Sequence, residues 1–335
     1  MSTKTYSPKQ VSPELLTTLT NSFGERVKFN EPLAPYLAYR VGGPADVLVF
    51  PEDEAELALI QRLAKDASIP LNIVGEGTNL LVVDEGIRGI VVSLKQSFKQ
   101  IVEVPNLMSR SSHHTWVQCG GGVLKPDLLK WAIARGLKGL EFSAGVPGTI
   151  GGGIFMNAGT KYGCYGDILK TLRIYHFDSG PENLSRDQIN FGYRSHQAVR
   201  DSIVVHATFE LTPGDSEAMQ KEVDRIILER ESKQPLHLPS CGSTFKNPMG
   251  ENPTGLSAGR LIEKANLKGT RIGGAEISQK HANFILNHGS ATATDIIKLI
   301  QLVQKEVKRL FGVELEREVI ILGGNSRGET EPKED

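Results

Sequence analysis

Several residue types and patterns are scarce or missing in this sequence. Its three cysteines, Cys119, Cys164 and Cys241, are odd in number and widely separated. Such usage argues against a disulfide framework and a cysteine-based metal site, and it favours a reducing compartment. No apolar run is long enough to span a bilayer, and residues 1–10 contain no apolar core of a secretory signal. We therefore expect a cytoplasmic protein without membrane insertion.

Neither sign of charge dominates. The formal net charge is −1, with 38 lysines and arginines against 39 aspartates and glutamates. No overall field therefore favours nucleic acid or an anionic membrane, although a local basic site for a phosphorylated ligand is compatible with this balance. The length allows roughly two or three domains, and the 39% apolar fraction is ordinary for a soluble globular protein. We expect no nucleic-acid partner, and nothing in the sequence indicates an obligate protein partner.

Charge is also missing from the most distinctive stretch of the chain, Ser143 to Gly159. It contains six glycines and no lysine, arginine or carboxylate. Glycine has no Cβ, so the backbone N–H groups of such a stretch can approach a ligand closely, and consecutive N–H groups form an anion site. The stretch is either a cradle for a phosphate-bearing cofactor or a glycine-rich bend packed against a strand. The motif alone does not separate these two interpretations.

A second glycine loop, residues 75–80, follows a predicted strand at residues 70–74. It is not a Walker A loop, because no Gly-Lys-Ser/Thr follows it. It is not a dinucleotide fingerprint, because Leu80 stands where the third glycine would fall. If the loop binds phosphate, it does so through N–H groups, the Thr78 hydroxyl and the Asn79 amide. A plain turn between two strands explains it equally well.

Apolar periodicity and capping residues predict the elements around these loops. We expect helices at residues 13–23, 52–67, 125–135, 215–232, 258–265 and 292–311. We expect strands at residues 45–50, 70–74, 80–83, 87–94, 167–177, 203–211, 282–286 and 313–322. Residues 101–119 are predicted to form a hairpin with a tip at 105–114. Neighbouring His113 and His114 would point to opposite faces of a strand, so we expect a solvated hairpin there and no metal site.

Three polar residues stand in unusual settings. Arg194 lies in a Tyr-Arg pair on a polar connector, and Ser243 is flanked by glycine and small residues. Glu318 lies in a predicted strand among apolar neighbours, on the same face as Glu316. Singly, a surface arginine, a turn serine and an edge-strand carboxylate explain them.

As a set, these residues suit the addition of hydride and proton across an activated double bond. An arginine can hold a carboxylate, a serine can pass a proton, and a carboxylate can stabilise developing charge. The chain has no Gly-x-Ser-x-Gly elbow. Cys241 is the other nucleophile candidate, but only His237 lies near it in sequence to act as a base.

Five motifs then follow one another in a specific order. They are Arg40-Val-Gly-Gly-Pro-Ala, Gly75-Glu-Gly-Thr-Asn-Leu-Leu, the Ser143 to Gly159 stretch, Phe191-Gly-Tyr-Arg-Ser and Cys241-Gly-Ser-Thr-Phe-Lys-Asn-Pro. From about Arg40 to Gly323 the chain resembles the UDP-N-acetylenolpyruvoylglucosamine reductase family, flavoenzymes that make UDP-N-acetylmuramate for peptidoglycan. The match looks like the shorter subtype, which lacks an extra tyrosine-bearing loop.

The resemblance implies an α+β fold. An FAD-binding domain of the vanillyl-alcohol-oxidase (PCMH) type, in two subdomains, is followed by a smaller α/β substrate-binding domain. The expected divisions are a leader and helix at residues 1–30, the FAD-binding domain at 31–213, the substrate-binding domain at 214–323 and a disordered tail at 324–335. Which element closes over the substrate stays open.

The resemblance also implies residue roles. Ser243 matches the serine that protonates the enol intermediate, and Arg194 and Glu318 match the other catalytic positions. FAD is expected to be held non-covalently, mostly by backbone N–H groups, at Gly75, Gly77, Thr78, Asn79, Leu80, Ala144, Gly145, Val146, Gly148, Thr149, Gly151, Gly152, Asn157 and Ala158. Substrate contacts are expected at Tyr193, Arg230, Lys246, Asn247 and His281. No metal is expected.

The implied reaction has two halves. NADPH reduces FAD, and N5 of the reduced flavin then delivers hydride to the enolpyruvyl group of UDP-N-acetylglucosamine enolpyruvate. Ser243 protonates the adjacent carbon, which gives the lactyl ether. Two alternatives remain: an FAD-dependent oxidase or dehydrogenase of another sugar, because this cofactor fold serves several chemistries, and a sugar-nucleotide-binding protein without turnover.

Overall fold

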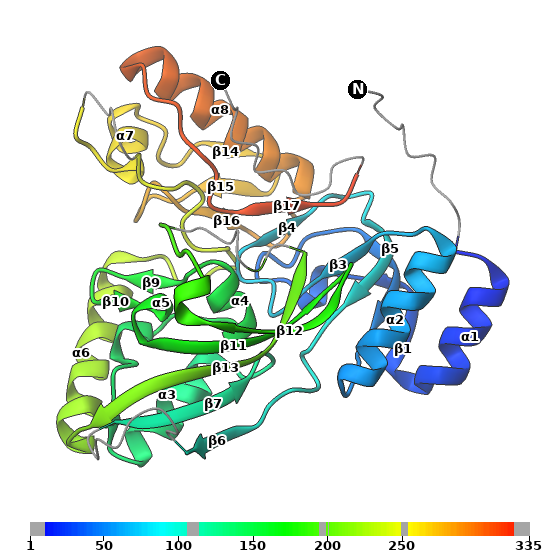
Figure 1. Cartoon of the computed structure of the whole chain (residues 1–335). Coiled ribbons are helices and arrows are strands. Elements are labelled where there is room, and N and C mark those ends of the chain that lie inside the picture. The colour runs from blue at the N-terminus through cyan, green and yellow to red at the C-terminus, as the bar shows by residue number, and fades with distance from the viewer. Residues whose placement is uncertain (1–10, 106–113, 194–198, 200, 249–253, 325–335) are drawn as a thin grey trace.

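The computed structural model describes residues 11–105, 114–193, 199, 201–248 and 254–324. Most of the predicted leader, residues 106–113 of the predicted hairpin tip, Arg194 and residues 325–335 of the predicted tail lie outside the described residues. Within them, the strands form sheets of four, six and three strands and two further pairs (Figure 1).

The four-stranded sheet has the order β1-β2-β5-β3. β1 (Val27–Pro32) pairs antiparallel with β2 (Pro44–Val49). β5 (Ile87–Val92) lies parallel between β2 and β3 (Leu71–Ile73). The runs of valine, leucine and isoleucine in β2 and β5 are buried, as expected for strands covered on both faces.

Helices α1 (Pro13–Phe23) and α2 (Glu54–Ala67) share a hydrophobic core with this sheet (Figure 1). The Ser12 Oγ accepts a hydrogen bond from the N–H of Leu15 at 3.2 Å, and Gly24 follows α1 with φ 55°. The predicted start and stop of this helix are therefore confirmed.

The six-stranded sheet has the order β12-β11-β13-β7-β6, with β8 paired to β13. Its strands are β6 (Ile101–Val104), β7 (Thr115–Gly120), β8 (Leu137–Lys138), β11 (Leu169–His176), β12 (Gly180–Ser185) and β13 (Ser202–Pro213). Its helices and the small pair beside it are α3 (Lys125–Ala134), α4 (Ile150–Phe155), β9 (Gly159–Thr160), β10 (Gly163–Cys164), α5 (Tyr165–Ile168) and α6 (Ser216–Lys233). β6 and β7 pair antiparallel, so the predicted hairpin is confirmed.

The strand predicted from residue 167 is wrong at its start. The Asp167 side chain accepts a hydrogen bond from the N–H of Cys164 at 2.8 Å, which caps the short helix α5. The strand therefore begins only at Leu169.

The three-stranded sheet consists of β14 (Arg271–Ile272), β15 (Ala275–Ile277) and β16 (Ile285–Asn287), covered by α7 (Ala258–Lys264) and α8 (Ala293–Phe311) (Figure 1). β16 starts later than the predicted strand at 282–286. The predicted capping box of α8 is confirmed. The Thr292 Oγ1 accepts from the N–H of Asp295 at 3.1 Å, and the Asp295 carboxylate accepts from the N–H of Thr292 at 3.0 Å.

The last predicted strand, residues 313–322, is wrong over most of its length. Only β17 (Ile320–Leu322) is a regular strand, and it pairs parallel with β4 (Leu80–Val82). The apolar side chains before it, Val313, Leu315 and Val319, are buried in the core around α8. A segment of irregular backbone can bury such side chains without pairing as a strand. The expectation that Glu316 and Glu318 share a strand face therefore fails. Glu316 is exposed, whereas Glu318 lines the cavity described below.

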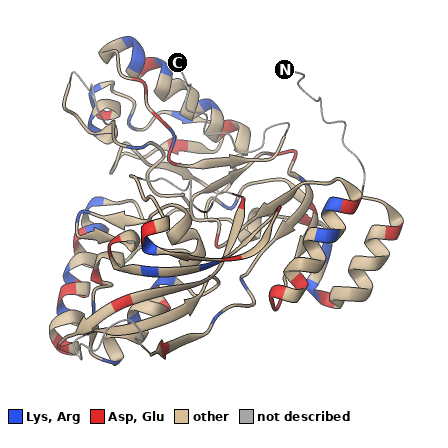
Figure 2. Cartoon of the chain, viewed as in Figure 1, with Lys and Arg blue, Asp and Glu red and all other residues tan. Residues whose placement is uncertain are grey.

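Charged residues of both signs alternate along the outer helices α6 and α8 (Figure 2), in keeping with the balanced composition. No helix within the described ranges is long and apolar enough to cross a bilayer. Nor does the described part of the chain contain a group of three histidine, cysteine or acidic side chains arranged to hold a metal ion.

Candidate active site

A cavity of about 1510 Å³ lies among the parts of the chain that form the four-stranded, six-stranded and three-stranded sheets, and residues from all three parts line it. Its walls include residues 75–80 and 240–243, most of residues 145–162, and Glu318. Ligand pockets usually measure about 300–1,000 Å³, so this cavity has room for a large cofactor and a second ligand.

Most residues predicted to bind the cofactor line this cavity: Gly75, Gly77, Thr78, Asn79, Leu80, Gly145, Val146, Thr149, Gly151, Gly152 and Ala158. The other three lie behind its surface. Ala144 is fully buried, Gly148 lies against Thr78, and Asn157 supports the backbone. The Asn157 Nδ2 donates to the carbonyl oxygen of Gly192 at 3.2 Å, and its Oδ1 accepts from the N–H of Gly166 at 3.0 Å.

The two glycine stretches face each other at close range. A Cβ on Gly148 would lie 2.7 Å from the Thr78 Oγ1, and a Cβ on Gly75 would lie 3.0 Å from the Thr149 Oγ1. Each stretch thus places a threonine hydroxyl over a glycine of the other. At Gly148 no larger residue fits without a shift, and its φ of 106° also favours glycine.

The first loop carries the backbone donors. Within the described residues, the N–H groups of residues 75–79 donate no hydrogen bond to the protein. Backbone donors without a protein acceptor need another partner, and five in succession suit an anionic group. The loop therefore fits the pyrophosphate of a bound cofactor.

The second stretch, Ser143 to Gly159, is not a continuous loop. The Thr149 Oγ1 accepts from the N–H of Gly152 at 3.2 Å and starts helix α4 inside it. The N–H of Ile150 donates to the carbonyl oxygen of Val123 at 2.8 Å, and the N–H of Gly151 donates to the carbonyl oxygen of Gly121 at 2.9 Å. This stretch is thus a packed bend that also forms part of the cavity wall, so a packed bend and a cofactor cradle, the two interpretations that its sequence left open, do not exclude each other.

Ser243 and Glu318 both line the cavity. They are held in register by their neighbours, because the carbonyl oxygen of Thr244 accepts from the N–H of Glu318 at 2.9 Å. The Asn79 Nδ2 also donates to the carbonyl oxygen of Glu318 at 2.9 Å, and the N–H of Ile320 donates to the carbonyl oxygen of Asn79 at 3.0 Å. Glu318 is therefore tied directly to the glycine loop at residues 75–80, and Ser243 is linked to Glu318 through the backbone of its neighbour Thr244.

Arg230 of α6 lines the same cavity. Its Nε is buried and has no hydrogen-bond acceptor among the described residues, and burial lowers the pKa of the guanidinium. A Cβ on Gly145 would lie 3.1 Å from this Nε, so glycine leaves the space that the arginine needs. A partly buried guanidinium whose Nε is an unused donor suits an anionic ligand.

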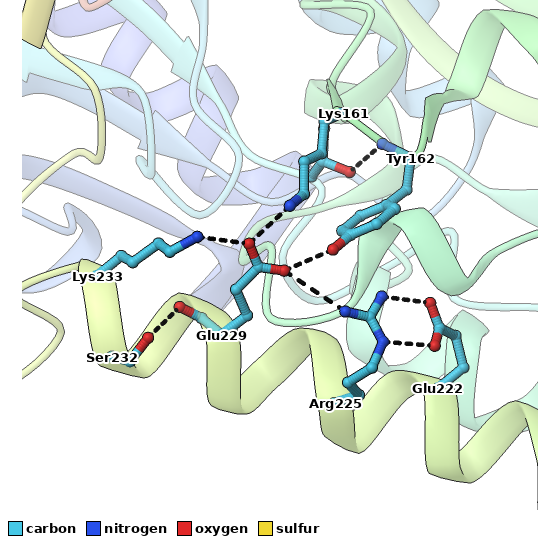
Figure 3. Close-up of polar contacts among 8 residues, drawn as sticks. Lys161, Tyr162, Glu222, Arg225, Glu229, Ser232 and Lys233 are labelled. Carbon is cyan, nitrogen blue, oxygen red and sulfur yellow. Dashed lines mark hydrogen bonds and ion pairs between the residues drawn. The ribbon is translucent and has the colours of Figure 1, made fainter.

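A charged cluster that the sequence did not reveal lies at the cavity wall (Figure 3). Glu229 of α6 accepts hydrogen bonds from the Nζ of Lys161 at 2.6 Å, the Nζ of Lys233 at 2.7 Å and the hydroxyl of Tyr162 at 2.5 Å. Arg225 lies 3.6 Å away. These donors, Lys161 first, lower the pKa of Glu229. The cluster fastens the turn between β9 and β10 to α6.

Lys125 is a second residue that sequence analysis passed over. It opens α3, it is 6% exposed, and it lines the cavity. The available signal was a lysine next to Pro126 at a helix start, which indicates a helix boundary and nothing about burial.

Three predicted substrate contacts do not line the cavity. Lys246 forms an ion pair with Glu316, and Tyr193 lies at the surface with 42% exposure. The ring of His281 packs edge-on against Phe284, with centroids 4.9 Å apart, and burial lowers its pKa.

Asn247 does line the cavity, and its Oδ1 accepts from the N–H of Ala258 at 3.2 Å at the start of α7. Cys241 is buried beside the glycine loop, where its thiol donates to the carbonyl oxygen of Leu80 at 3.3 Å. Burial raises the pKa of this thiol, so it stays protonated near neutral pH. The structure thus argues against thiol catalysis.

Comparison with known proteins agrees with this geometry. Residues 45–179 match the FAD binding domain, and residues 234–322 match the C-terminal domain of UDP-N-acetylenolpyruvoylglucosamine reductase. A protein of the latter name from Moorella thermoacetica is 41% identical over 298 residues, which cover 89% of this chain and 94% of that protein. The chain belongs to the UDP-N-acetylenolpyruvoylglucosamine reductase family. Another relative of that name, from Lactococcus lactis subsp. cremoris, is 42% identical and covers 92% of this chain and 98% of its own.

Membership in this family fixes the fold and the cofactor. The crystal structure of the reductase from Thermus caldophilus aligns with a TM-score of 0.71 and 32% identity, over 89% of this chain and 98% of that one. The predicted α+β fold with an FAD-binding domain is therefore confirmed, and so is the prediction of an FAD-containing oxidoreductase. The unused N–H groups of the first glycine loop fit this cofactor.

Proposed function

We propose that this chain is a cytoplasmic, NADPH-dependent enzyme of peptidoglycan precursor synthesis. It reduces the enolpyruvyl group of UDP-N-acetylglucosamine enolpyruvate to the lactyl ether of UDP-N-acetylmuramate. The observation that carries the proposal is the position of Ser243 and Glu318 in the cavity that both glycine stretches line. FAD, when bound there, supplies the redox chemistry by taking hydride from NADPH and passing it to the substrate.

The protein's own residues complete the reaction. Ser243 delivers the proton to the carbon next to the ether oxygen, so that hydride and proton together saturate the double bond. A serine hydroxyl is a weak acid, and it needs the negative charge that develops on the substrate to give up its proton. Glu318 stabilises charge at the reacting carbon or, when protonated, donates a hydrogen bond to the enolate. Arg194 is assigned to the substrate carboxylate.

Binding is divided between two sets of hydrogen-bond donors in the cavity lining. We assign the N–H groups of residues 75–79 to the cofactor pyrophosphate and Arg230 to the diphosphate of the sugar nucleotide, because phosphates accept strong hydrogen bonds from both kinds of donor. Tyr193, Lys246 and His281 stay proposed substrate contacts that move into place only with ligand bound. Asn247, which already lines the cavity, also stays a proposed substrate contact. We keep the proposed division into an FAD-binding domain at 31–213 and a substrate-binding domain at 214–323.

The replacement Ser243→Ala separates the two half-reactions. Flavin reduction by NADPH should be unchanged, because the serine has no part in it. Reduction of the sugar nucleotide should fall by about 10²–10⁴-fold, the usual contribution of a positioned acid. Both are measured by flavin absorbance under anaerobic conditions.

Ser240→Ala is the matched control, since Ser240 lines the cavity three residues earlier and has no assigned role. It should leave both half-reactions within a few-fold of the unmodified enzyme. An equal loss of both half-reactions in Ser243→Ala would show that the serine supports the fold or the flavin and does not supply the proton.

A further inference from the structure

We propose that Asn283 is a positioning residue, which fixes the backbone after Ser243 so that the serine hydroxyl keeps its place relative to the substrate carbon that it protonates. The inference rests on the proposed function, in which Ser243 supplies the proton. Asn283 lies in the turn before β16 and is 4% exposed. It does not line the cavity, so it acts only through the segment that carries the serine.

The amide of Asn283 pairs with both backbone groups of Phe245. Its Oδ1 accepts from the N–H of Phe245 at 3.0 Å, and its Nδ2 donates to the carbonyl oxygen of Phe245 at 2.8 Å. The main-chain carbonyl oxygen of Asn283 accepts from the N–H of Thr244 at 2.8 Å. One buried residue therefore makes three hydrogen bonds to the two residues that directly follow Ser243.

These bonds occupy one edge of the segment, because the other edge is already paired. Thr244 and Lys246, on either side of Phe245, form two backbone hydrogen bonds of 2.9 Å with residues 316–318, in an antiparallel bridge. In such a bridge the N–H and carbonyl groups of the central residue point away from the paired segment. Within the described residues, those two groups of Phe245 bond only to Asn283. The amide thus takes the place of a second neighbouring strand.

The chain before Ser243 gives less support. Cys241 is held through its thiol, but Gly242 separates it from the serine. Gly242 has a φ of 72°, and no atom lies within 4 Å of the position that a Cβ would take. Glycine restricts the backbone least of all residues. The position of Ser243 therefore depends on the chain after it, which Asn283 fixes.

Burial gives this amide its meaning. The neighbouring Ala282, Phe284 and Ile285 are buried and apolar, so packing alone does not require an amide between them. A buried amide is unfavourable unless it is hydrogen-bonded, and here both of its halves are bonded to Phe245. A proton donor must lie within hydrogen-bond reach of its target, and a displacement of about 1 Å can slow a reaction about 10²-fold. The pairing therefore suits control of the serine position.

The test uses Asn283→Ala, which removes the two side-chain hydrogen bonds to Phe245. Reoxidation of the reduced flavin by UDP-N-acetylglucosamine enolpyruvate should be roughly 10–100-fold slower, because Ser243 is displaced. Flavin reduction by NADPH and the dissociation constant of the sugar nucleotide should change by no more than about twofold, because neither needs the serine hydroxyl. Anaerobic stopped-flow absorbance and a binding titration measure these quantities.

A double-mutant cycle separates positioning from general support of the fold. When Ser243→Ala is already present, Asn283→Ala should slow reoxidation by no more than about twofold further, because the hydroxyl that it positions is gone. A role in the fold alone would give the same loss whether or not the serine is present. If Asn283→Ala does not fold, Asn283→Asp is measured in its place with the same expectations. This variant keeps the shape of the side chain and an acceptor for the N–H of Phe245, and it removes the amide donor.

Asn287→Ala is the matched control. Asn287 is 3% exposed, and its amide also bonds to backbone, but away from the serine. Its Nδ2 donates to the carbonyl oxygen of Tyr39 at 2.8 Å, and its Oδ1 accepts from the N–H groups of Gly289 and Ala291 at 2.7 and 3.1 Å. The control should lower the midpoint of thermal unfolding about as much as Asn283→Ala, because each leaves buried backbone groups without a partner. It should leave reoxidation within about threefold of the unmodified rate.

Reoxidation of Asn283→Ala at the unmodified rate would overturn the proposal. A loss that is equally large in the presence of Ser243→Ala would also overturn it, and so would an equal loss of flavin reduction by NADPH, since these results would assign Asn283 to the fold or to the flavin site. Failure of the proposed function would appear elsewhere. The sugar nucleotide would not reoxidise the reduced flavin of the unmodified protein, or Ser243→Ala would reoxidise at the unmodified rate.

Discussion

The side chain of Arg230 shows a conflict between stability and function within one residue. Its buried Nε finds no acceptor among the described residues, which costs stability in the absence of a ligand. We expect Arg230→Met to stabilise the ligand-free protein by about 1 kcal/mol, because the unsatisfied donor is removed. The affinity for the sugar nucleotide should fall about tenfold or more, because a charge-assisted hydrogen bond is lost.

Denaturant unfolding and a binding titration measure the two effects. Lys221→Met, at an exposed position of the same helix, is the control and should change neither. An Arg230→Met variant that is less stable and binds the sugar nucleotide normally would assign the arginine to the core.

Sequence reasoning at the residue scale succeeded where local composition carried the information. The setting of Ser243 among small residues and the glycines around Gly75 and Gly148 indicated a ligand site, and the structure places them at one cavity. Lys125 and Glu229 could not be found in this way. Their positions in the cavity lining depend on segments that are distant in the chain, and a lysine at a helix start or a glutamate on an amphipathic helix usually faces solvent.

At the scale of elements, Glu229 connects the turn between β9 and β10 to α6 (Figure 3). Its carboxylate neutralises Lys161 and Lys233 at the cavity wall. Glu229→Gln should therefore raise the positive potential there and strengthen binding of the anionic sugar nucleotide by roughly two- to fivefold at low salt.

The gain should disappear at high ionic strength, because these groups are screened. The matched control is Glu222→Gln, which breaks a pair with Arg225 on the same helix at a position outside the cavity lining. Titrations of each variant with the sugar nucleotide at two salt concentrations measure this effect. A loss of affinity in Glu229→Gln that does not depend on salt would mean that the cluster orders the turn between β9 and β10 and does not set the electrostatic potential.

A second contact between elements joins the turn after β4 to the start of α8. The Asp84 carboxylate accepts hydrogen bonds from the N–H of Ala293 at 2.8 Å, the N–H of Thr294 at 2.9 Å and the Thr294 hydroxyl at 2.7 Å. Asp84→Ala should destabilise the protein by about 1–2 kcal/mol, as expected for a lost helix cap. Glu85→Ala, its exposed neighbour, should have little effect.

The same contact predicts a pH dependence. Partial burial favours the neutral form of Asp84, but the hydrogen bonds from Thr294 and Ala293 outweigh it and hold the pKa below its usual 3.8. A lowered pKa in the folded state means that the stabilisation is complete above 3.8 and is lost as the pH falls through the folded value. Denaturant unfolding should therefore show a constant difference between Asp84→Ala and the unmodified protein near neutral pH, which shrinks only below about pH 4. A difference that grows on acidification would contradict this assignment.

Prediction at the scale of elements was best for amphipathic helices with capping residues. Ser12 and Gly24 bound α1, and the Thr292–Asp295 box starts α8, because caps act through neighbours in sequence. It failed at residues 313–319, whose apolar residues fill the core beside α8 without forming a strand. Alternating apolar residues indicate that one face of a segment is buried. Whether the segment also pairs as a strand depends on a partner strand, which cannot be identified from the local sequence.

For the whole molecule, the C-terminal part of the chain completes the cavity wall. After the three-stranded sheet and α8, the chain returns as β17 and pairs with β4, which directly follows the first glycine loop. This pairing brings Glu318 beside Asn79. The order of the sequence motifs predicted that the two glycine stretches, Ser243 and Glu318 contribute to one site. The parallel β4–β17 pair that brings them together joins segments more than two hundred residues apart and could not be predicted from periodicity.

The central claim is that one cavity passes reducing equivalents from NADPH to an enolpyruvyl sugar nucleotide. Anaerobic stopped-flow absorbance of the purified protein tests it most directly. We predict that NADPH alone bleaches the bound flavin, and that UDP-N-acetylglucosamine enolpyruvate then restores the colour with one UDP-N-acetylmuramate formed for each flavin. Bleaching by a free sugar without NADPH, or reduced flavin that the enolpyruvyl sugar nucleotide does not reoxidise, would contradict the account.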